Sequence, residues 1–328
     1  MEAAAAQMAM KASRWRQVDG VLLLDKPAGM TSNAALQKAR RLFSAAKAGH
    51  TGTLDPMATG LLPICFGEAT KFSADLLHAD KAYEAELLLG VTTDSGDREG
   101  VVTATLPVRC ADADIDAVLP RFTGDILQVP PMHSALKRDG VPLYVLARAG
   151  QTVAREARPV TIHTLECIAR DLPRLTLRVT CGKGVYIRTL AEDLGEALGC
   201  GAHLTMLRRI RVGQMELREA QTLPALEAMP ETERLAHLSP VDRLISLLPA
   251  VTLTREKARR FAHGNPVSHT RSPGRVRVYV ESPVSDLLLG LGEIREDGLL
   301  WPRRLTSFGE SRDAEMLSAG LKFTPARN

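Results

Sequence analysis

Residues 49–60 have the sequence Gly-His-Thr-Gly-Thr-Leu-Asp-Pro-Met-Ala-Thr-Gly. Three glycines and a proline in twelve residues argue against a helix or a regular strand. Glycine adopts backbone angles that other residues avoid, and proline biases the residue before it toward an extended conformation. The stretch therefore predicts a shaped loop that carries one carboxylate, Asp55, with small neighbours that leave room for a ligand. The alternative is that Asp55 only organises a turn, since Asp-Pro is a common turn dipeptide.

The composition sets the broad class of protein. A chain of 328 residues is long enough for one large domain with a substantial core and a smaller second one. Its 42 Lys and Arg against 38 Asp and Glu give a formal charge of +4, which permits nucleic-acid binding through local patches without indicating it. The five scattered cysteines show no CxxC or Cys/His spacing, so neither a disulfide framework nor a zinc site is predicted. Without a bilayer-length apolar segment or a signal peptide, we expect a soluble, cytoplasmic protein.

The hydrophobic pattern around the loop predicts both strands and helices. The apolar run at 21–24 indicates a buried strand, and alternation at 83–89, 160–168 and 175–181 indicates further strands. Hydroxyl and amide side chains at 31–33 offer N-cap oxygens for a helix to about residue 44, and leucines share one face of a second helix at 189–198. Strands with interspersed helices and no repeated βαβ spacing predict an α+β fold with a mixed, largely antiparallel sheet and flanking helices.

Changes in composition and hydrophobic pattern along the chain predict its domain organisation. Residues 1–18 look like a flexible tail, 19–249 form the main domain, and 214–249 are a charged connection with a helix around 241–248. Within the main domain, 126–155 lose periodicity and are basic, which is typical of a functional or mobile segment. A basic helix at 255–263, strands at 276–280 and 287–294, and the hairpin signal Asp297-Gly298 predict a small β-rich unit over 250–306. Residues 307–328 are expected to be a polar tail.

The loop at 49–60, together with GVLLLDKPAGMTS at 20–32, resembles the catalytic-aspartate motif of the bacterial-type tRNA pseudouridine synthase B family. The resemblance covers most of residues 20–305. Met57, Gly182 and Val185 depart from the usual Leu, Ser and Thr, and none of these changes removes an ionisable group. Further matches follow in order along the chain: KAYEAELLLGVTTDSGD at 81–97, PPMHSALK at 130–137, REARPV at 155–160, GKGVYIRTL at 182–190 and GCGAHLTMLRR at 199–209.

This resemblance implies a fold, an activity and a partner. The fold would be that of the pseudouridine synthases, with a PUA-like RNA-binding unit at 250–306. The activity would be isomerisation of uridine to pseudouridine at position 55 in the T-loop of tRNA, with the segment at 126–155 closing over the T-arm stem-loop. The resemblance favours a stand-alone monomer that needs no guide RNA or obligatory protein partner, and it is compatible with an added role in tRNA folding.

The chemistry of this isomerisation assigns roles to Asp55 and Arg188. The bond from ribose C1′ to N1 breaks and the base rejoins through C5, so no atoms are gained or lost and no cofactor or metal is required. Asp55 would be the ionised carboxylate that reacts, at C6, at C1′ or by taking a sugar proton. Arg188 would pair with it and lower its pKa by about 1–3 units. Tyr186 lies two residues before Arg188, so on an extended chain both side chains would project to the same face. The alternative for Arg188 is a surface position at a strand end.

The family match also suggests roles for four further residues. Tyr83 would stack on the target base or move a proton at C5, His50 would help displace the stacked base, Leu207 would line the pocket, and Lys26 would support the Asp55 loop. By pattern alone, Tyr83 and Leu207 are equally well explained as core residues and His50 as an ordinary loop histidine. The adjacent Arg208 and Arg209 would contact the RNA backbone.

Two other classes of function remain open at this stage. A non-catalytic RNA-binding or RNA-folding protein would keep the basic segments but has no need for an Asp55–Arg188 pair. A nucleoside or glycoside hydrolase would use two carboxylates that flank the bond, and no second acid is placed as sharply as Asp55. For the isomerase, the target base must leave its stack, at a cost of about a few kcal/mol.

Overall fold

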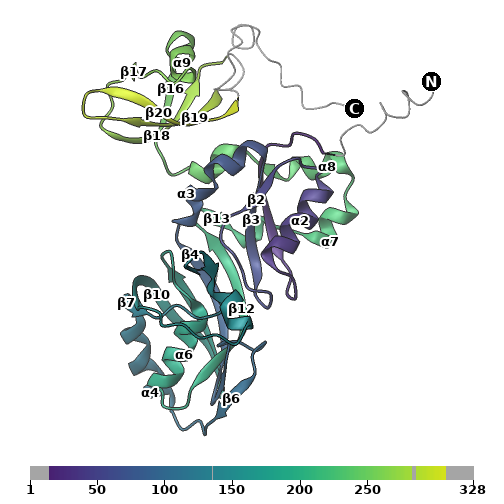
Figure 1. Cartoon of the computed structure of the whole chain (residues 1–328), viewed down its shortest axis with the longest axis vertical. Coiled ribbons are helices and arrows are strands. Elements are labelled where there is room, and N and C mark those ends of the chain that lie inside the picture. Colours follow the sequence, from purple (N-terminus) through teal and green to yellow (C-terminus); the bar gives the residue numbers. More distant parts are fainter. Residues whose placement is uncertain (1–14, 135, 283–285, 308–328) are drawn as a thin grey trace, which may run out of the picture.

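A computed structural model describes residues 15–134, 136–282 and 286–307. The C-terminal unit occupies one end of the long axis, and the main sheet extends from the middle to the other end (Figure 1). The predicted tails at 1–14 and 308–328 lie outside the described residues. Residues 15–18 do not behave as a tail, because the Arg16 N–H donates to the Ser44 carbonyl at 2.8 Å and Val18 is buried. No helix within the described ranges has the length and hydropathy needed to span a bilayer.

One large mixed sheet organises the described part of the main domain and confirms the predicted α+β class. Its neighbours pair antiparallel except for β1 with β14 and β3 with β12, which are parallel. Shorter strands β2 (Ala48–His50), β13 (Met215–Glu216) and β15 (Leu238–Ser239) pair with its members. In spatial order the strands are β14 (Gln221–Thr222), β1 (Gly20–Lys26), β3 (Thr59–Phe66), β12 (Ala202–Val212), β4 (Lys81–Leu89), β11 (Arg174–Cys181), β10 (Arg158–Asp171) and β7 (Gly124–Gln128).

The apolar residues of strand β1 follow one another without interruption because both of its faces are buried. Leu22 and Leu24 belong to the core that includes Leu36 of helix α2 (Ser32–Leu42). Val21 and Leu23 point to the opposite face and pack in a second core with Phe72. Because both faces of this part of the sheet are covered, the strand has no solvent-facing side that would call for polar residues.

Helices α2 and α6 (Ile187–Ala197) bury one face each, as their periodicity predicts. The Thr31 hydroxyl caps α2 by accepting a hydrogen bond from the Ala34 N–H at 3.1 Å. Leu190 and Leu194 of α6 are 1% exposed in the main core. The other helices of the main domain are α3 (Ser73–Leu77), α4 (Asp112–Val118), α5 (Leu143–Arg148), α7 (Leu223–Ala228) and α8 (Glu231–Ala236), with 3-10 turns η1 (Gly67–Phe72), η2 (Leu119–Phe122), η3 (Leu217–Glu219) and η4 (Val241–Ile245).

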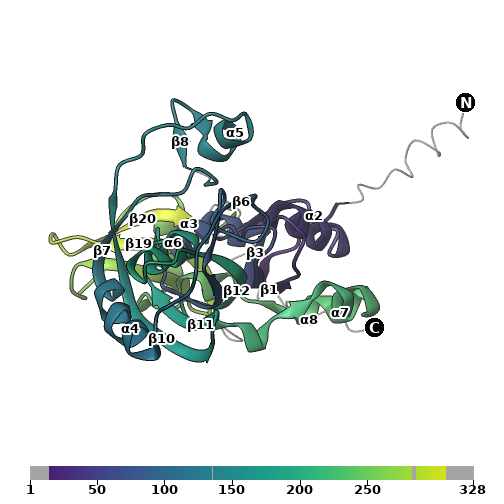
Figure 2. The ribbon, with the colours of Figure 1, turned by 90° about the horizontal axis from the view of Figure 1, so that it is seen from below.

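Two hairpins project from the sheet. The first joins β5 (Val91–Thr93) to β6 (Val102–Thr105). The second joins β8 (Lys137–Arg138) to β9 (Val141–Pro142) and leads into α5, and Figure 2 shows this element standing away from the sheet. The segment at 126–155, predicted to lack periodicity, therefore holds the end of β7, a short hairpin and a short helix.

The stretch at 214–249 contains more regular structure than its composition predicts, because α7 and α8 were not recognised from the sequence. Beyond it, a five-stranded sheet and the basic helix α9 (Arg255–Ala262) form the C-terminal unit. Gly264, with φ of +83°, follows the end of α9 as predicted. The strands of this unit are β16 (Ala250–Leu253), β17 (Val267–Ser268), β18 (Gly274–Val280), β19 (Leu287–Ile294) and β20 (Leu299–Leu305).

Candidate active site

The glycine-rich stretch is a loop between two paired strands. Its ends belong to β2 and β3, so only residues 51–58 are loop, a shorter span than the sequence predicts. Gly60 has φ of +102°, and a Cβ there would lie 2.3 Å from the Arg209 carbonyl oxygen. Gly52 has φ of +73°, and its Cβ would meet the Arg209 side chain at 3.3 Å. Both glycines are needed because the backbone at these two positions lies directly against Arg209 of β12.

The loop that carries Asp55 is fixed by hydrogen bonds on both sides of the carboxylate. The Ser32 hydroxyl accepts from the Leu54 N–H at 2.8 Å and is 2.9 Å from the Leu54 carbonyl, to which it donates. The fully buried Lys26 ammonium donates to the Pro56 carbonyl at 3.3 Å. The same ammonium also donates to the carbonyls of Pro27 (2.8 Å) and Met30 (2.6 Å). Lys26 therefore contacts the backbone of this loop, and its supporting role stays a prediction.

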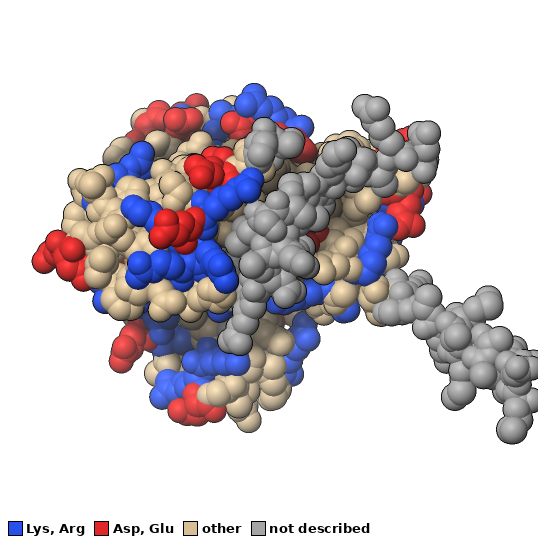
Figure 3. All heavy atoms as spheres, turned by 90° about the horizontal axis from the view of Figure 1, so that it is seen from above, with Lys and Arg blue, Asp and Glu red and all other residues tan. Residues whose placement is uncertain are grey.

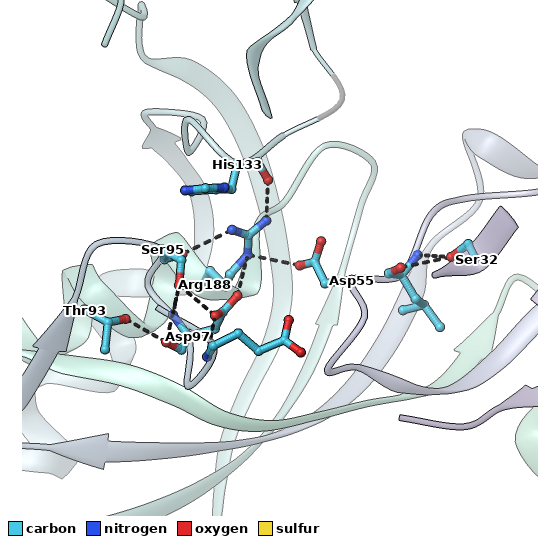
Figure 4. A network of polar contacts seen from close by, with 9 residues as sticks. Ser32, Asp55, Thr93, Ser95, Asp97, His133 and Arg188 are labelled. Atoms are coloured by element: carbon cyan, nitrogen blue, oxygen red, sulfur yellow. Dashed lines mark hydrogen bonds and ion pairs between the residues drawn. The ribbon is translucent and has the colours of Figure 1, made fainter. Parts of the chain in front are cut away.

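Asp55 and Arg188 form an ion pair. The Arg188 Nε lies 3.0 Å from Asp55 Oδ2, and the guanidinium also donates to the carbonyls of Ser95 at 3.1 Å and His133 at 2.6 Å (Figure 4). Arg188 is only 5% exposed, whereas the Asp55 side chain is 34% exposed. The predicted pairing is therefore present, with the cation buried and the carboxylate open to a ligand.

A second carboxylate, Asp97, completes this network and was not singled out from the sequence. Its Oδ2 lies 3.8 Å from Arg188 Nε, and it is buried. Its Oδ1 accepts from the Ser95 hydroxyl at 2.7 Å and from the Glu99 N–H at 3.0 Å (Figure 4). The turn chemistry at 94–100 was visible in the sequence, but nothing there distinguished Asp97 from an ordinary turn aspartate.

The pKa of Asp55 differs from the sequence-based expectation. Burial raises the pKa of this carboxyl, and the negative charge of Asp97 adds to that effect. Arg188 and, less strongly, Lys26 lower it, but the pKa is raised overall. The lowering effect predicted for Arg188 is present, but loss of hydration outweighs it, so the net shift is upward. The pKa of Lys26 is lowered to about 8, chiefly by burial, although the charge of Asp55 opposes this.

Asp55 and Arg188 lie where two cavities meet. The smaller one has a volume of about 320 Å³ and the larger one about 670 Å³. The smaller cavity is lined by Gly52, Thr53, Leu54, Asp55, Leu77, Lys81, Tyr83, His133, Ser134, Gly182, Gly184, Val185, Tyr186, Ile187, Arg188, Leu207 and Arg209. The larger one also contains residues of α2, of the turn at 94–101 and of α5. A ligand can therefore approach Asp55 from two sides.

Comparison with known proteins identifies the family. Residues 40–187 match the model described as TruB family pseudouridylate synthase (N terminal domain), 188–246 match tRNA pseudouridylate synthase B C-terminal domain, and 249–306 match Pseudouridine synthase II TruB, C-terminal. The chain is 61% identical over 297 residues to tRNA pseudouridine synthase B of Dechloromonas aromatica, which covers 90% of this chain and 98% of that relative. The protein of the same name from Burkholderia mallei is 58% identical over 302 residues, covering 90% and 99%. The chain belongs to the TruB family of pseudouridylate synthases.

Solved structures confirm the fold. The archaeal box H/ACA sRNP Nop10–Cbf5 complex contains a chain 25% identical to this one, with a TM-score of 0.65 and coverage of 90% of this chain and 87% of that one. A chain of the Cbf5–Nop10–Gar1 complex is 26% identical, with a TM-score of 0.64 and coverage of 90% and 81%. The family resemblance and the fold class predicted from the motifs are confirmed.

In this TruB-family chain, all of the other predicted site residues except Lys26 line one of the two cavities. Tyr83, Tyr186 and Leu207 line the smaller cavity, and His50 lines the larger one. The His50 Nδ1 is buried and has no hydrogen-bond partner among the described residues. Burial, aided by the positive charge of Arg209, lowers the pKa of this imidazole and so disfavours its protonated form. Lys26 lines neither cavity and lies behind the loop.

The placement of Arg188 on a strand is wrong. Tyr186 is the N-cap of α6, and Arg188 is the second residue of that helix. The extended-chain argument therefore does not explain why both line the smaller cavity. Gln128 fixes the turn instead, since its amide donates to the Tyr186 carbonyl at 3.3 Å and accepts from the Tyr186 N–H at 3.0 Å.

The predicted RNA-backbone contacts of Arg208 and Arg209 are not supported by the geometry. Arg208 is paired with Asp25, at 2.7 Å and 3.2 Å between the guanidinium nitrogens and the carboxylate oxygens. Arg209 is 1% exposed and donates to the carbonyls of Leu61 and Gly52. The two arginines are equivalent in the sequence, and only the pleat of β12 turns one outward and the other into the core.

Proposed function

We propose that this TruB-family chain isomerises uridine to pseudouridine at position 55 in the T-loop of tRNA, with Asp55 as the reacting carboxylate. We further propose that it acts on the T-arm as a monomer, without a guide RNA or an obligatory protein partner. Family membership supports the coarser assignment, isomerisation of uridine in tRNA, because relatives 58–61% identical to this chain are named tRNA pseudouridine synthase B.

The observation that carries this proposal is the geometry of the Asp55 carboxylate. Arg188 engages only its Oδ2, and Oδ1 carries no hydrogen bond from the described residues (Figure 4). Buried donors hold the loop on both sides, so the free oxygen is held in position before a substrate arrives. A preorganised carboxylate beside a fixed guanidinium can attack or take a proton with little rearrangement.

The smaller cavity fits a base that has left its stack. Tyr83 and Tyr186 contribute aromatic rings to its lining, and Leu207 contributes an apolar wall. One stack of a base on an aromatic ring contributes about 1–3 kcal/mol, which offsets most of the cost of flipping a base from a loop. Leu207 is only 7% exposed, so it would contact a bound base without needing to move.

The larger cavity offers a path for the RNA strand. His50 and the N-terminal end of α2 form one side, and Tyr144 and Arg148 of α5 form another. The Arg148 guanidinium lies 5.5 Å from the centre of the Tyr144 ring, so this helix presents a cation and an aromatic face together. We propose that the segment at 126–155, which projects from the sheet, closes over the T-arm from this side (Figure 2).

The test is to incubate unmodified tRNA with the purified protein alone and to map pseudouridine at single-nucleotide resolution. We expect modification at position 55, and the Asp55→Asn variant should give none while its RNA affinity stays within about tenfold, because phosphate contacts lie elsewhere. Modification at another position would refute the proposed site on tRNA. Turnover by Asp55→Asn near the wild-type rate would remove this carboxylate from the mechanism, and binding without modification by the wild-type chain would favour an RNA-binding or RNA-folding protein.

A further inference from the structure

Arg209 is one of the most deeply buried polar side chains of the described structure. It is 1% exposed, and arginine is almost never fully buried unless it is paired. Its guanidinium donates to two carbonyl oxygens: Nε to Leu61 at 2.8 Å and Nη2 to Gly52 at 3.1 Å. None of the ion pairs found within the described ranges involves it. The guanidinium also interacts with the Tyr83 phenol. A charge held in the interior without a carboxylate partner among the described residues calls for an explanation beyond packing.

The position of Arg209 places it against Tyr83. The two residues face each other across the ladder between β4 and β12, and both line the smaller cavity with Asp55. Burial is the largest influence on the Tyr83 phenol and raises its pKa, and the charges of Asp55 and Cys181 raise it further. Arg209 is the cation that opposes them, and it lowers the pKa of this phenol.

The hydrogen bond to Gly52 links this cation to the loop that carries Asp55. The carbonyl of Gly52 lies three residues before the carboxylate, and the backbone of Gly60 packs on the Arg209 backbone at the other end of the loop. Arg209 therefore touches both ends of the loop and reaches the phenol opposite it. The guanidinium is thus bonded to the loop that carries Asp55 and lies beside the Tyr83 phenol.

The proposed reaction contains a step that such an arrangement would serve. After C5 of the base has bonded to C1′, C5 still carries its original proton. That C5–H bond must break, with its electron pair completing the C5=C6 double bond, and N1 must finish with a proton taken from solvent. A phenolate oxygen can accept the C5 proton, and the step involves no oxidation or reduction.

We propose that Arg209 is a positioning residue for this proton transfer: its guanidinium holds Tyr83 and the Asp55 loop in the arrangement in which the Tyr83 oxygen can accept the C5 proton. This inference rests on the proposed function, and it assigns to Arg209 a role that differs from contact with the RNA backbone. Its neighbour Arg208, paired with Asp25 on the opposite side of β12, provides a matched control.

The first measurement does not depend on activity. The chain has four tyrosines, so ¹³Cζ-tyrosine labelling gives few resonances, and Tyr83→Phe assigns the relevant one. The phenol pKa should rise by at least about one unit in Arg209→Met and Arg209→Gln, because an opposite charge close by shifts a pKa by about 1–3 units. It should stay near the wild-type value in Arg209→Lys and in Arg208→Met. An unchanged pKa in a neutral Arg209 variant that melts as a folded protein would overturn the proposal.

The second measurement follows the chemical step, with saturating tRNA that carries deuterium at C5 of the target uridine. If removal of the C5 proton has become slow, Arg209→Gln should show a larger isotope effect than the wild type, and raising the pH should recover part of its rate. A purely structural role predicts an equal loss of rate in Arg209→Lys and Arg209→Gln, with no increase in the isotope effect and no recovery of rate at higher pH. This result would also overturn the proposal. If the wild-type chain makes no pseudouridine, the proposed function fails, and the phenol titration still decides the role of Arg209.

Discussion

Replacing Arg188 should slow the isomerisation step itself and leave RNA binding largely intact. Arg188 is buried and contacts Asp55, Asp97 and two carbonyls, so an alanine there leaves two facing carboxylates without a shared cation. Lysine keeps the charge but cannot present Nε to Asp55 while it donates to both carbonyls. We therefore expect Arg188→Lys to be impaired and Arg188→Ala to be impaired more severely.

The size of the effect follows from the geometry of the pair. Opposite charges about 4 Å apart near a protein surface attract by about 4 kcal/mol. Because the Asp55 side chain is 34% exposed, water screens the pair, and we take about half of that value. One pKa unit corresponds to about 1.4 kcal/mol, so loss of Arg188 should raise the pKa of Asp55 by about 1 to 2 units. Removing a donor placed at a reacting group typically slows the chemical step by about a hundredfold or more.

The assay is single-turnover kinetics with saturating tRNA over a range of pH, which separates chemistry from association. The reaction needs the ionised carboxylate, and burial already raises the pKa of Asp55. A further rise must shift the acidic limb of the rate profile to higher pH, by the same 1 to 2 units estimated above. The competing view makes Arg188 a phosphate contact. It predicts unchanged single-turnover rates, weaker binding and a salt dependence reduced by about one ion, and this pattern would refute our reasoning.

Three further outcomes can be checked. Asp97→Asn removes a charge that raises the pKa of Asp55, so the acidic limb should shift to lower pH, opposite to the change in Arg188→Ala. Gly60→Ala should lower the free energy of unfolding by more than about 2 kcal/mol in denaturant titration, whereas Gly29→Ala, also at positive φ but with open space around its Cβ, should cost less. Truncation after residue 249 should weaken binding of whole tRNA more than of a T-arm hairpin and reduce its salt dependence, because α9 exposes four Lys and Arg. Equal affinity and salt dependence in a folded truncated protein would exclude an RNA role for that unit.

The truncation experiment depends on the exposed Lys and Arg side chains of the C-terminal unit and not on the net charge of the whole chain. On the end of the molecule that carries the C-terminal unit, Lys and Arg are interspersed with Asp and Glu (Figure 3). The formal charge of +4 is therefore not gathered into one continuous basic field on this face. The salt dependence of binding should report individual phosphate contacts, which makes single substitutions on α9 informative.

Local sequence determined the elements whose signals are short-range. The hydroxyl and amide side chains at 31–33 predicted the start of α2, Gly264 the end of α9, and Asp297-Gly298 the turn before β20, because caps and turns depend on a few neighbouring residues. The apolar run in β1 predicted a buried strand for the same reason. The helices α7 and α8 escaped recognition because each is only six residues long, which is too short for a hydrophobic period to show.

For the candidate site as well, some properties could be predicted from the sequence and others only the tertiary structure shows. The sequence alone identified Asp55 in a glycine-rich loop and, through its motifs, the partner Arg188. It could not show that burial outweighs this partner in setting the Asp55 pKa, that Asp97 shares the same guanidinium, or that Arg209 and not Arg208 lies inside. Those properties depend on how segments far apart in the chain come together. Desolvation and charge pairing are set by the surroundings of an atom, and only the tertiary structure decides those surroundings.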